Sequence, residues 1–474
     1  MKKLMSILVL AGAFAVSAAD AALEQAKTLG QATQKTSAGN THSEAQWFPE
    51  AGMGLFIHWG IAAVRAKGDI SWCMLANRPW YDGTLTPNEY YGSIKDWHPE
   101  AMDFDRMLGE AKAAGCTYAS LVTKHHDGFT LWPSEFGDLG TKSTFQGRDF
   151  VKEFVSACRK HGLKICLYYS PPDWWFDRNV RSWGFRGPAI DMDHKPVQLP
   201  PKPQDHDAKR QALVQGQVRE LLTRYGKIDM IFFDGGRGEI PNDEVRRLQP
   251  GIVINRRNGS GGDYSDTEGK LPGRRFSGWF EANLPCWPKR MWSYREPSEY
   301  GGHDAATMLT MLAILRSWGG NLLANVGPKG DGSLPESALP CWQAMAAWMA
   351  HSRESVIGAQ PGPWPEQVNL PVTRREGVAY IHFLPPFPEK QPGLPPGEKD
   401  FTKFRELIPP LPAATDTAVW KNAPQPAKVT LLRTGEVLPF EFKDGTLTLT
   451  LPARCRTGLV DVVKLDLVKT EPAK

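Results

Sequence analysis

The sequence IDMIFFDGG, Ile228–Gly236, indicates the fold class. A nearly continuous apolar run ends at Asp234, and two glycines follow it. Runs of this kind are typical of strands that are buried on both faces of a parallel sheet. An Asp-Gly pair is also common in simple turns. The segment therefore predicts a buried strand over Ile228–Phe233, with Asp234 at its carboxyl end as the strongest candidate functional residue.

The same pattern recurs on both sides of this segment, in alternation with amphipathic helices. Further strands are predicted at Gly54–Trp59, Tyr118–Thr123, Lys164–Tyr169, Gly251–Asn255 and Asn321–Val326. Helices are predicted at Phe104–Ala114, Phe150–His161, Ala208–Tyr225 and Ala305–Trp318. Strands that alternate with helices over roughly 300 residues favour an α/β fold, either a (β/α)8 barrel or a doubly wound sheet.

Polar residues at the ends of the strands distinguish these two folds. They are His58-Trp59, His125-His126-Asp127, Tyr168-Tyr169-Ser170, Asp234-Gly235 and Asn255-Arg256-Arg257. A barrel brings the carboxyl ends of all its strands around one pocket, whereas an open sheet brings them to one switch point. The chain has no G-x-G-x-x-G or Walker-type loop, so a nucleotide-binding sheet lacks its fingerprint. We predict a (β/α)8-like (TIM-type) catalytic barrel over residues 45–360.

The chain changes character after Trp364. Apolar and polar residues alternate at Val378–Phe383, Lys428–Leu432, Thr446–Leu451 and Val460–Val468, and Asp444-Gly445 fits a hairpin turn. We predict a C-terminal antiparallel β-sandwich over residues 365–474, with a proline-rich surface loop at 385–412. A second long loop, Pro171–His206, is a candidate lid or subsite wall at the mouth of the barrel.

Composition excludes several classes of function. The 474 residues are 41% hydrophobic and 23% charged, with a net charge of +4 and no run of basic residues. These values are globular, and they do not indicate a nucleic-acid partner. Seventeen tryptophans are a high number, which fits either sugar binding or large buried cores. The oligomeric state is left open.

The N-terminus predicts export. Lys2 and Lys3 precede an apolar stretch at Leu4–Val16, and Ala19-Asp20-Ala21 fits a cleavage site. We expect residues 1–22 to be a signal peptide and the protein to be periplasmic or extracellular. No membrane span is expected after this segment. The seven cysteines contain no C-x-x-C pair, so we expect no zinc ribbon and no essential disulfide.

The polar strand ends suggest chemistry on a sugar. Glycoside hydrolysis needs two carboxyl groups that flank the scissile bond. With Asp234 as the first, the candidates for the second are Glu268 and Glu281. Histidines at strand ends offer both a donor and an acceptor to hydroxyl groups. An alternative is a zinc or iron site formed by His58, His125 or His126, and Asp127, but no H-E-x-x-H spacing supports it.

Several long motifs resemble one family, the α-L-fucosidases of glycoside hydrolase family 29. The resemblance covers most of the chain and rests on GMGLFIHWG (52–60), HHDGFTLWPS (125–134), GLKICLYYS (162–170), FFDGG (232–236), GGDYSDTE (261–268) and GGNLLANVGPKGDG (319–332). Three positions depart from the family pattern. Phe232 replaces a frequent tryptophan, and Ser71-Trp72 replaces a Glu-Trp pair that some members have. Phe280-Glu281 replaces a Trp-Glu pair of the family. The Trp-Gly-Tyr segment that follows this pair in the family is Trp292-Ser293-Tyr294 here.

The resemblance implies a retaining exo-glycosidase that uses no metal or organic cofactor. Asp234 matches the family nucleophile, and His58, His125 and His126 match residues that hydrogen-bond the hydroxyls of fucose. Arg257 and one of Tyr168 or Tyr169 match further pocket positions. Trp59 and Phe232 are the candidate aromatic residues for contact with the sugar.

On this basis we expect an exported enzyme that releases L-fucose from fucosylated oligosaccharides or glycoconjugates. Either Glu268 or Glu281 would serve as the acid/base. The alternatives are a glycosidase for another 6-deoxy or L-galactose-type sugar, and a non-catalytic barrel that only binds carbohydrate.

Overall fold

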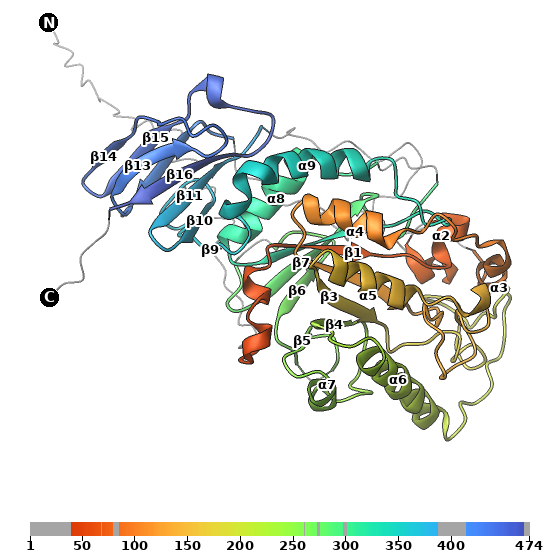
Figure 1. Ribbon diagram of the computed structural model, residues 1–474. Coiled ribbons are helices and arrows are strands. Elements are labelled where there is room, and N and C mark those ends of the chain that lie inside the picture. The colour runs from red at the N-terminus through yellow and green to blue at the C-terminus, as the bar shows by residue number, and fades with distance from the viewer. Residues whose placement is uncertain are drawn as a thin grey trace, which may run out of the picture.

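The computed structural model describes residues 39–67, 69–78, 85–259, 261–272, 275–296, 301–386 and 414–468. The expected signal peptide at 1–22 and nearly all of the expected proline-rich loop at 385–412 lie outside these residues. One large parallel sheet and two smaller antiparallel sheets organise the described chain. Figure 1 shows the antiparallel sheets beside helices α8 and α9, at one side of the parallel sheet.

Eight parallel strands form the large sheet. They are β1 (Met53–Ile57), β2 (Tyr118–Lys124), β3 (Lys164–Tyr169), β4 (Met230–Phe233), β5 (Val253–Ile254), β6 (Ser265–Glu268), β7 (Phe280–Trp287) and β8 (Asn321–Val326). Their order is β5-β4-β3-β2-β1-β8-β7-β6. The two edge strands meet through a parallel bridge between Asn255 and Tyr264. The sheet therefore curls into a barrel-like (β/α)8 arrangement, and the prediction of a TIM-type barrel is confirmed.

Helices cover the outside of this sheet (Figure 1). They are α4 (Phe104–Ala113), α5 (Phe150–Lys160), α6 (His206–Thr223), α7 (Asn242–Leu248), α8 (Ala305–Ser317) and α9 (Ala338–Ser352). Asp103, Asp149 and Asp304 start α4, α5 and α8, because each carboxylate accepts a backbone N–H of the first turn. The described residues that connect β5 to β6 and β6 to β7 contain no helix.

Alternation along the strands places one set of side chains inside the barrel. Phe56, Tyr118, Tyr168 and Phe232 belong to one buried cluster together with Trp292. Their neighbours on the same strands, such as Tyr169 and Phe233, belong to the larger cluster between the sheet and the helices. Because successive side chains of a strand face opposite ways, this register decides which strand-end residues face the pocket.

The antiparallel sheets follow the barrel in sequence. One contains β9 (Gln360–Pro361), β10 (Val372–Arg375), β11 (Val378–Phe383), β13 (Pro426–Leu431) and β16 (Asp461–Leu467). The other contains β12 (Thr417–Lys421), β14 (Glu441–Lys443) and β15 (Thr446–Thr450). The predicted hairpin turn is present, since Asp444 and Gly445 join β14 to β15 with φ of 49° and 72°. Trp348 of α9 donates its indole N–H to the carbonyl of Val460, 2.7 Å away.

None of the helices in the described residues has both the length and the apolar character needed to cross a membrane. All seven cysteines lie in the described residues and are buried as free thiols.

Candidate active site

A pocket opens at the carboxyl ends of the parallel strands, where the sequence places its polar residues. It is lined by Phe56, His58, Ile70, Trp72, His125, Tyr168, Phe232, Asp234, Arg257, Glu268, Asn283 and Trp292. Strands β1, β2, β3, β4, β6 and β7 or the residues that follow them supply most of this lining. Seven of the predicted site residues therefore meet in one place, although they come from distant parts of the sequence.

Asp234 follows β4 directly, accepts hydrogen bonds from two donors and lies near His126. The Tyr168 hydroxyl donates to Oδ2 at 2.7 Å, and Arg257 donates to Oδ1 at 3.1 Å. His126 Nε2 lies 3.8 Å from Oδ2. About a quarter of the side chain, 24%, stays exposed, so a ligand can reach the carboxylate.

The charge state of Asp234 follows from these neighbours. Burial alone would raise the pKa of the carboxyl, but His126, Arg257 and the Tyr168 hydrogen bond together lower its pKa below the ordinary value. The Arg257 charge and the Tyr168 hydroxyl act at neutral pH whether or not His126 is protonated. Asp234 is therefore an ionised carboxylate, which is the form that a nucleophile needs.

The three histidines are each held through Nδ1 by a neighbouring side chain. His58 contacts Asn325 Oδ1 at 2.6 Å, His125 contacts the Ser71 hydroxyl, and His126 contacts the Ser170 hydroxyl. Burial lowers the pKa of His58 to about 3 and that of His126 to about 4. Burial also lowers the pKa of His125 well below its ordinary value. All three rings are therefore neutral at physiological pH.

The tautomer of His58 follows from its partner. The amide nitrogen of Asn325 donates to the carbonyl of Trp292 at 2.7 Å, so Oδ1 is the atom that faces His58. An oxygen accepts, and His58 must therefore donate from Nδ1. Nε2 is left with a lone pair and can accept a hydrogen bond from a hydroxyl group in the pocket.

Arg257 joins the acidic groups of the pocket. Its guanidinium contacts Asp234 at 3.1 Å, Glu268 at 3.0 Å, and Asp266. The same nitrogen contacts Asp234 Oδ1 and Glu268 Oε2, so these two oxygens lie at most about 6 Å apart, close to the separation of the carboxyl pair in retaining glycosidases. The guanidinium occupies the gap between the two carboxylates, and the free space in the pocket is only about 40 Å³.

Aromatic side chains form an apolar wall next to the charged groups, since the Arg257 guanidinium lies over the Phe232 ring. Tyr168 stacks on Phe232 with ring centroids 5.6 Å apart, and Phe56 packs against both rings. Trp292 packs 5.0 Å from His58. The sequence did not single out Phe56, Ile70, Asn283 or Trp292 as site residues. Trp72 also lines the pocket, and Ser71 beside it supports His125, in place of the Glu-Trp pair of the family pattern.

Four predicted site residues are not part of this lining: His126, which lies beside Asp234, Glu281, and the two aromatic residues Tyr169 and Trp59. The Tyr169 hydroxyl donates to Gln217 of α6 at 2.7 Å, which places this side chain on the helix side of the sheet. Trp59 packs between Trp97 and Phe150 and donates to the carbonyl of Lys329. Of the pair Tyr168 and Tyr169, only Tyr168 faces the pocket, because their side chains point to opposite faces of β3.

Glu281 is not brought together with Asp234. It is the second residue of β7 and is paired in register with Asp266, two residues before Asn283, which lines the pocket. Glu281 is fully buried in the barrel interior and accepts a hydrogen bond from Tyr118, the first residue of β2. Burial raises the pKa of Glu281 to about 8. Its position below the pocket does not support the prediction of Glu281 as acid/base, and of the two predicted glutamates Glu268 alone lines the pocket.

The residues that could hold a metal ion differ from those that the sequence suggested. Ligand atoms of His125, His126 and Asp234 lie within 4.8 Å of one another. Asp127 is not among them, because its carboxylate accepts from the Tyr90 hydroxyl at 2.6 Å and from the backbone of Phe129. Arg257 already places a positive charge against Asp234, which opposes the approach of a cation to the same carboxylate.

A parallel barrel with paired carboxylates, neutral histidines and an aromatic wall at the carboxyl ends of its strands defines a glycoside hydrolase. A family model described as alpha-L-fucosidase matches residues 18–354. The chain belongs to the α-L-fucosidase family, and the resemblance found in the sequence is confirmed.

Individual relatives agree with this assignment. The tissue alpha-L-fucosidase of Bos taurus is 26% identical over 387 residues, which cover 72% of this chain and 75% of the relative. Alpha-L-fucosidase isoenzyme 1 from Paenibacillus thiaminolyticus superposes with a TM-score of 0.73 at 25% identity, over 90% of this chain and 99% of the other. A family 29 alpha-L-fucosidase from Bacteroides thetaiotaomicron, trapped as a covalent intermediate, superposes with a TM-score of 0.70 at 20% identity over 93% and 99%.

Proposed function

We propose that this glycoside hydrolase is a retaining exo-α-L-fucosidase in which Asp234 is the nucleophile and Glu268 the acid/base. The observation that carries the proposal is the shared contact of both carboxylates with one nitrogen of Arg257. A pair this close fits double displacement, because an inverting pair needs room for a water between the carboxyl groups. The Bacteroides relative is described as a covalent intermediate, which fits the same chemistry.

The reaction proceeds in two displacements. Asp234 attacks the anomeric carbon of the fucoside while the bond from that carbon to the leaving oxygen breaks, and Glu268 donates its proton to that oxygen. A water then attacks the same carbon, and Glu268 takes a proton from the water. The bond to Asp234 breaks, which releases L-fucose and restores the free carboxylate. Two inversions give net retention of configuration.

The pocket lining suits a 6-deoxy sugar. Three neutral imidazoles offer acceptors and donors to the hydroxyls, while Phe56, Phe232 and Trp292 offer an apolar surface to the methyl group at C5. Arg257 must leave the gap between the carboxylates when the sugar enters. As the family resemblance implies, we expect the reaction to need no metal ion and no organic cofactor.

The substrates would be the fucosylated oligosaccharides or glycoconjugates that the sequence predicts. The N-terminal pattern supports export to the periplasm or the outside of the cell. Burial of all seven free thiols is compatible with an oxidising compartment, because a buried thiol does not meet a partner for a disulfide.

The test uses 4-nitrophenyl α-L-fucopyranoside and the matching α-L-galactopyranoside, with the first-formed sugar followed by proton NMR. The proposal predicts turnover of the fucoside and α-L-fucose as the first product. Formation of β-L-fucose first would contradict retention. Faster hydrolysis of the galactoside would be consistent with the double displacement but would show that fucose is not the preferred sugar. Absence of hydrolysis with both glycosides would favour a barrel that binds carbohydrate without cleaving it.

A further inference from the structure

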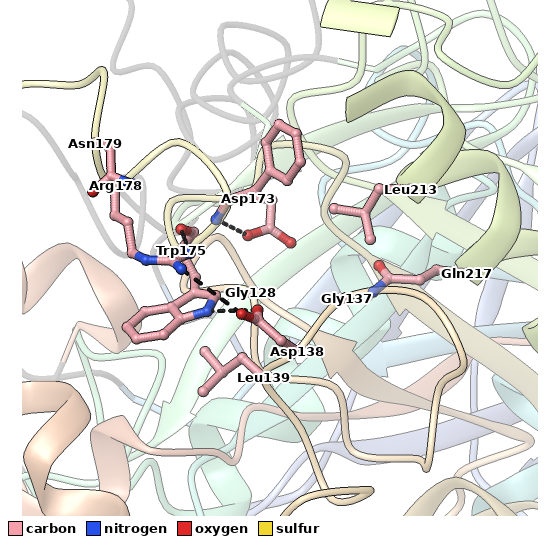
Figure 2. A pocket seen from close by; sticks show the side chains of 11 residues that line it. Gly128, Gly137, Asp138, Leu139, Asp173, Trp175, Arg178, Asn179, Leu213 and Gln217 are labelled. Atoms are coloured by element: carbon pink, nitrogen blue, oxygen red, sulfur yellow. Dashed lines mark hydrogen bonds and ion pairs between the residues drawn. The ribbon is translucent and has the colours of Figure 1, made fainter. Parts of the chain in front are cut away.

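A second cavity lies next to the loop that follows His125 and His126. It has a volume of about 380 Å³, and its lining includes Asp138, Asp173, Trp175, Arg178, Leu213 and Gln217. Figure 2 shows Trp175 and Arg178 on one side of it and Leu213 and Gln217 on the other. This volume falls within the range of roughly 300–1,000 Å³ that small-molecule sites occupy. The cavity and the active pocket share none of their lining residues.

One side of the cavity carries an indole, a guanidinium and a carboxylate that contact one another. The indole N–H of Trp175 donates to Asp138 Oδ1 at 2.8 Å, and the guanidinium of Arg178 stacks on the same indole at 4.1 Å. Arg178 also lies 3.7 Å from Asp138 Oδ2. A carboxylate has about four acceptor positions, so Asp138 can take further hydrogen bonds from ligand hydroxyls.

Two further lining residues, Asp173 and Gln217, are buried and already have partners. Asp173 accepts from Lys124 at 3.1 Å and from the backbone of Phe176 at 2.9 Å. Gln217 accepts from Tyr169 at 2.7 Å and donates to the carbonyl of Phe136 at 2.8 Å. These bonds fix the wall in place before any ligand arrives, which lowers the entropic cost of binding.

The charges of the lining favour a neutral ligand. Each acid of the wall has a basic partner, since Asp138 faces Arg178 and Asp173 pairs with Lys124. Asp138 would repel an anion that approaches Arg178, and Arg178 would repel a cation that approaches Asp138. Leu139, Phe176 and Leu213 add apolar surface to these polar groups. A pyranose offers both hydroxyls and apolar C–H faces, and thus matches this mixture.

We propose that this cavity binds a neutral saccharide independently of the active pocket. Trp174, next to Asp173, donates its backbone N–H to the carbonyl of His126 at 2.6 Å. The bound saccharide would therefore contact the loop next to the segment that carries His125 and His126. The ligand class follows from the cavity alone and does not depend on which glycoside the enzyme cleaves.

Calorimetric titration with lactose tests the proposal on the full-length protein. Wild type should bind lactose saturably, and lactose should not inhibit hydrolysis of the aryl fucoside. Leu213→Trp fills the cavity and should weaken binding at least about tenfold, while Leu213→Met preserves the volume and should bind within about twofold of wild type. Asp138→Ala alters an exposed carboxylate, with 69% of the side chain accessible, and should also weaken binding without loss of folding.

Turnover of the aryl fucoside should stay within about twofold of wild type in all three variants, since none of the changed residues lines the active pocket. The proposal is overturned if lactose does not bind saturably to wild type, if Leu213→Trp and Asp138→Ala both bind it as wild type does, or if lactose competes with the fucoside. Failure of the proposed function is seen separately, as absence of fucoside turnover.

Discussion

At the scale of single residues, the two glutamates Glu268 and Glu281 differ in what surrounds them. Glu268 lines the pocket and contacts Arg257 beside Asp234, whereas Glu281 is enclosed below the pocket against Tyr118. We expect Glu268→Gln to lower kcat on a fucoside with a poor leaving group by about 10²–10⁴-fold, because the leaving oxygen loses its proton donor. An activated leaving group such as 2,4-dinitrophenol should reduce this loss for the first displacement.

Glu281→Gln is the matched control for this experiment. Its amide oxygen can still accept from Tyr118, and its neutral amide resembles the protonated acid that a raised pKa favours. Turnover should stay within about threefold of wild type. A larger loss in Glu281→Gln than in Glu268→Gln would contradict the assignment.

The buried carboxyl of Glu281 also predicts how stability depends on pH. Its pKa rises from 4.5 to about 8 on folding because burial disfavours the charged form. Between these values the folded state holds a proton that the unfolded state lacks, so stability falls as pH rises, by about 1.4 kcal/mol per pH unit.

The Glu281→Gln variant isolates this contribution, since the amide does not titrate. Its melting temperature should exceed that of wild type by more at pH 8 than at pH 5. An equal difference at both pH values would show that Glu281 does not carry a raised pKa.

At the scale of elements, Arg316 anchors the end of α8. It is fully buried and donates to one side-chain and four backbone oxygens, which belong to Asn321, Gly320, Val356, Pro49 and Ala359. These contacts join α8 to the start of β8 and to the residues after α9. Arg316→Met would leave the acceptors without partners and should lower the free energy of unfolding by at least about 3 kcal/mol.

Urea unfolding measures this change. Arg65→Met serves as the control, because Arg65 pairs with Asp96 at the surface with 43% of its side chain exposed, and its loss should cost under about 1 kcal/mol. Equal destabilisation by the two variants would contradict the role of Arg316.

Elements also show how far the sequence could predict the fold. Strands with continuous apolar runs, such as β3 and β4, were predicted with nearly the right bounds. Strands β6 and β7 were not, because their sequences SDTE and FEANLPCW place carboxylates, Asn283 and Pro285 where a buried strand usually has apolar residues. Asp266 and Glu268 contact Arg257, and Glu268 and Asn283 line the pocket, so polar residues of the site interrupt the apolar run by which these two strands could have been recognised.

The candidate site shows a similar division. Asp234, Arg257 and the three histidines could be predicted, because a polar residue after a buried strand stands out in sequence. Phe56 and Trp292 could not be predicted, because an apolar residue inside a barrel gives the same sequence pattern whether its side chain faces the core or the pocket. Trp59 is a candidate for contact with the sugar, and Tyr169 is the alternative to Tyr168. Both lie on the helix side of the sheet, because a shift of one residue along a strand changes the face on which a side chain lies.

At the scale of the whole molecule, hydrogen bonds connect the barrel to the antiparallel sheets. Trp348 of α9 donates to Val460, Thr373 of β10 donates to Ser355, and Arg375 donates to Glu354. Apolar side chains of α8 and α9 are buried in the same cluster as those of β10, β11 and β16. We expect one cooperative transition in differential scanning calorimetry. Two transitions separated by more than about 5 °C would show that the two parts unfold independently.

Azide rescue of Asp234→Gly tests the proposed role of Asp234 as the nucleophile. Removal of the carboxylate should abolish turnover of the aryl fucoside, and azide should restore it by entering the space that the side chain leaves. The product should be β-L-fucosyl azide, because azide displaces the leaving group in a single inversion. Wild-type turnover in Asp234→Gly, or a rescued product with the α configuration, would contradict the account.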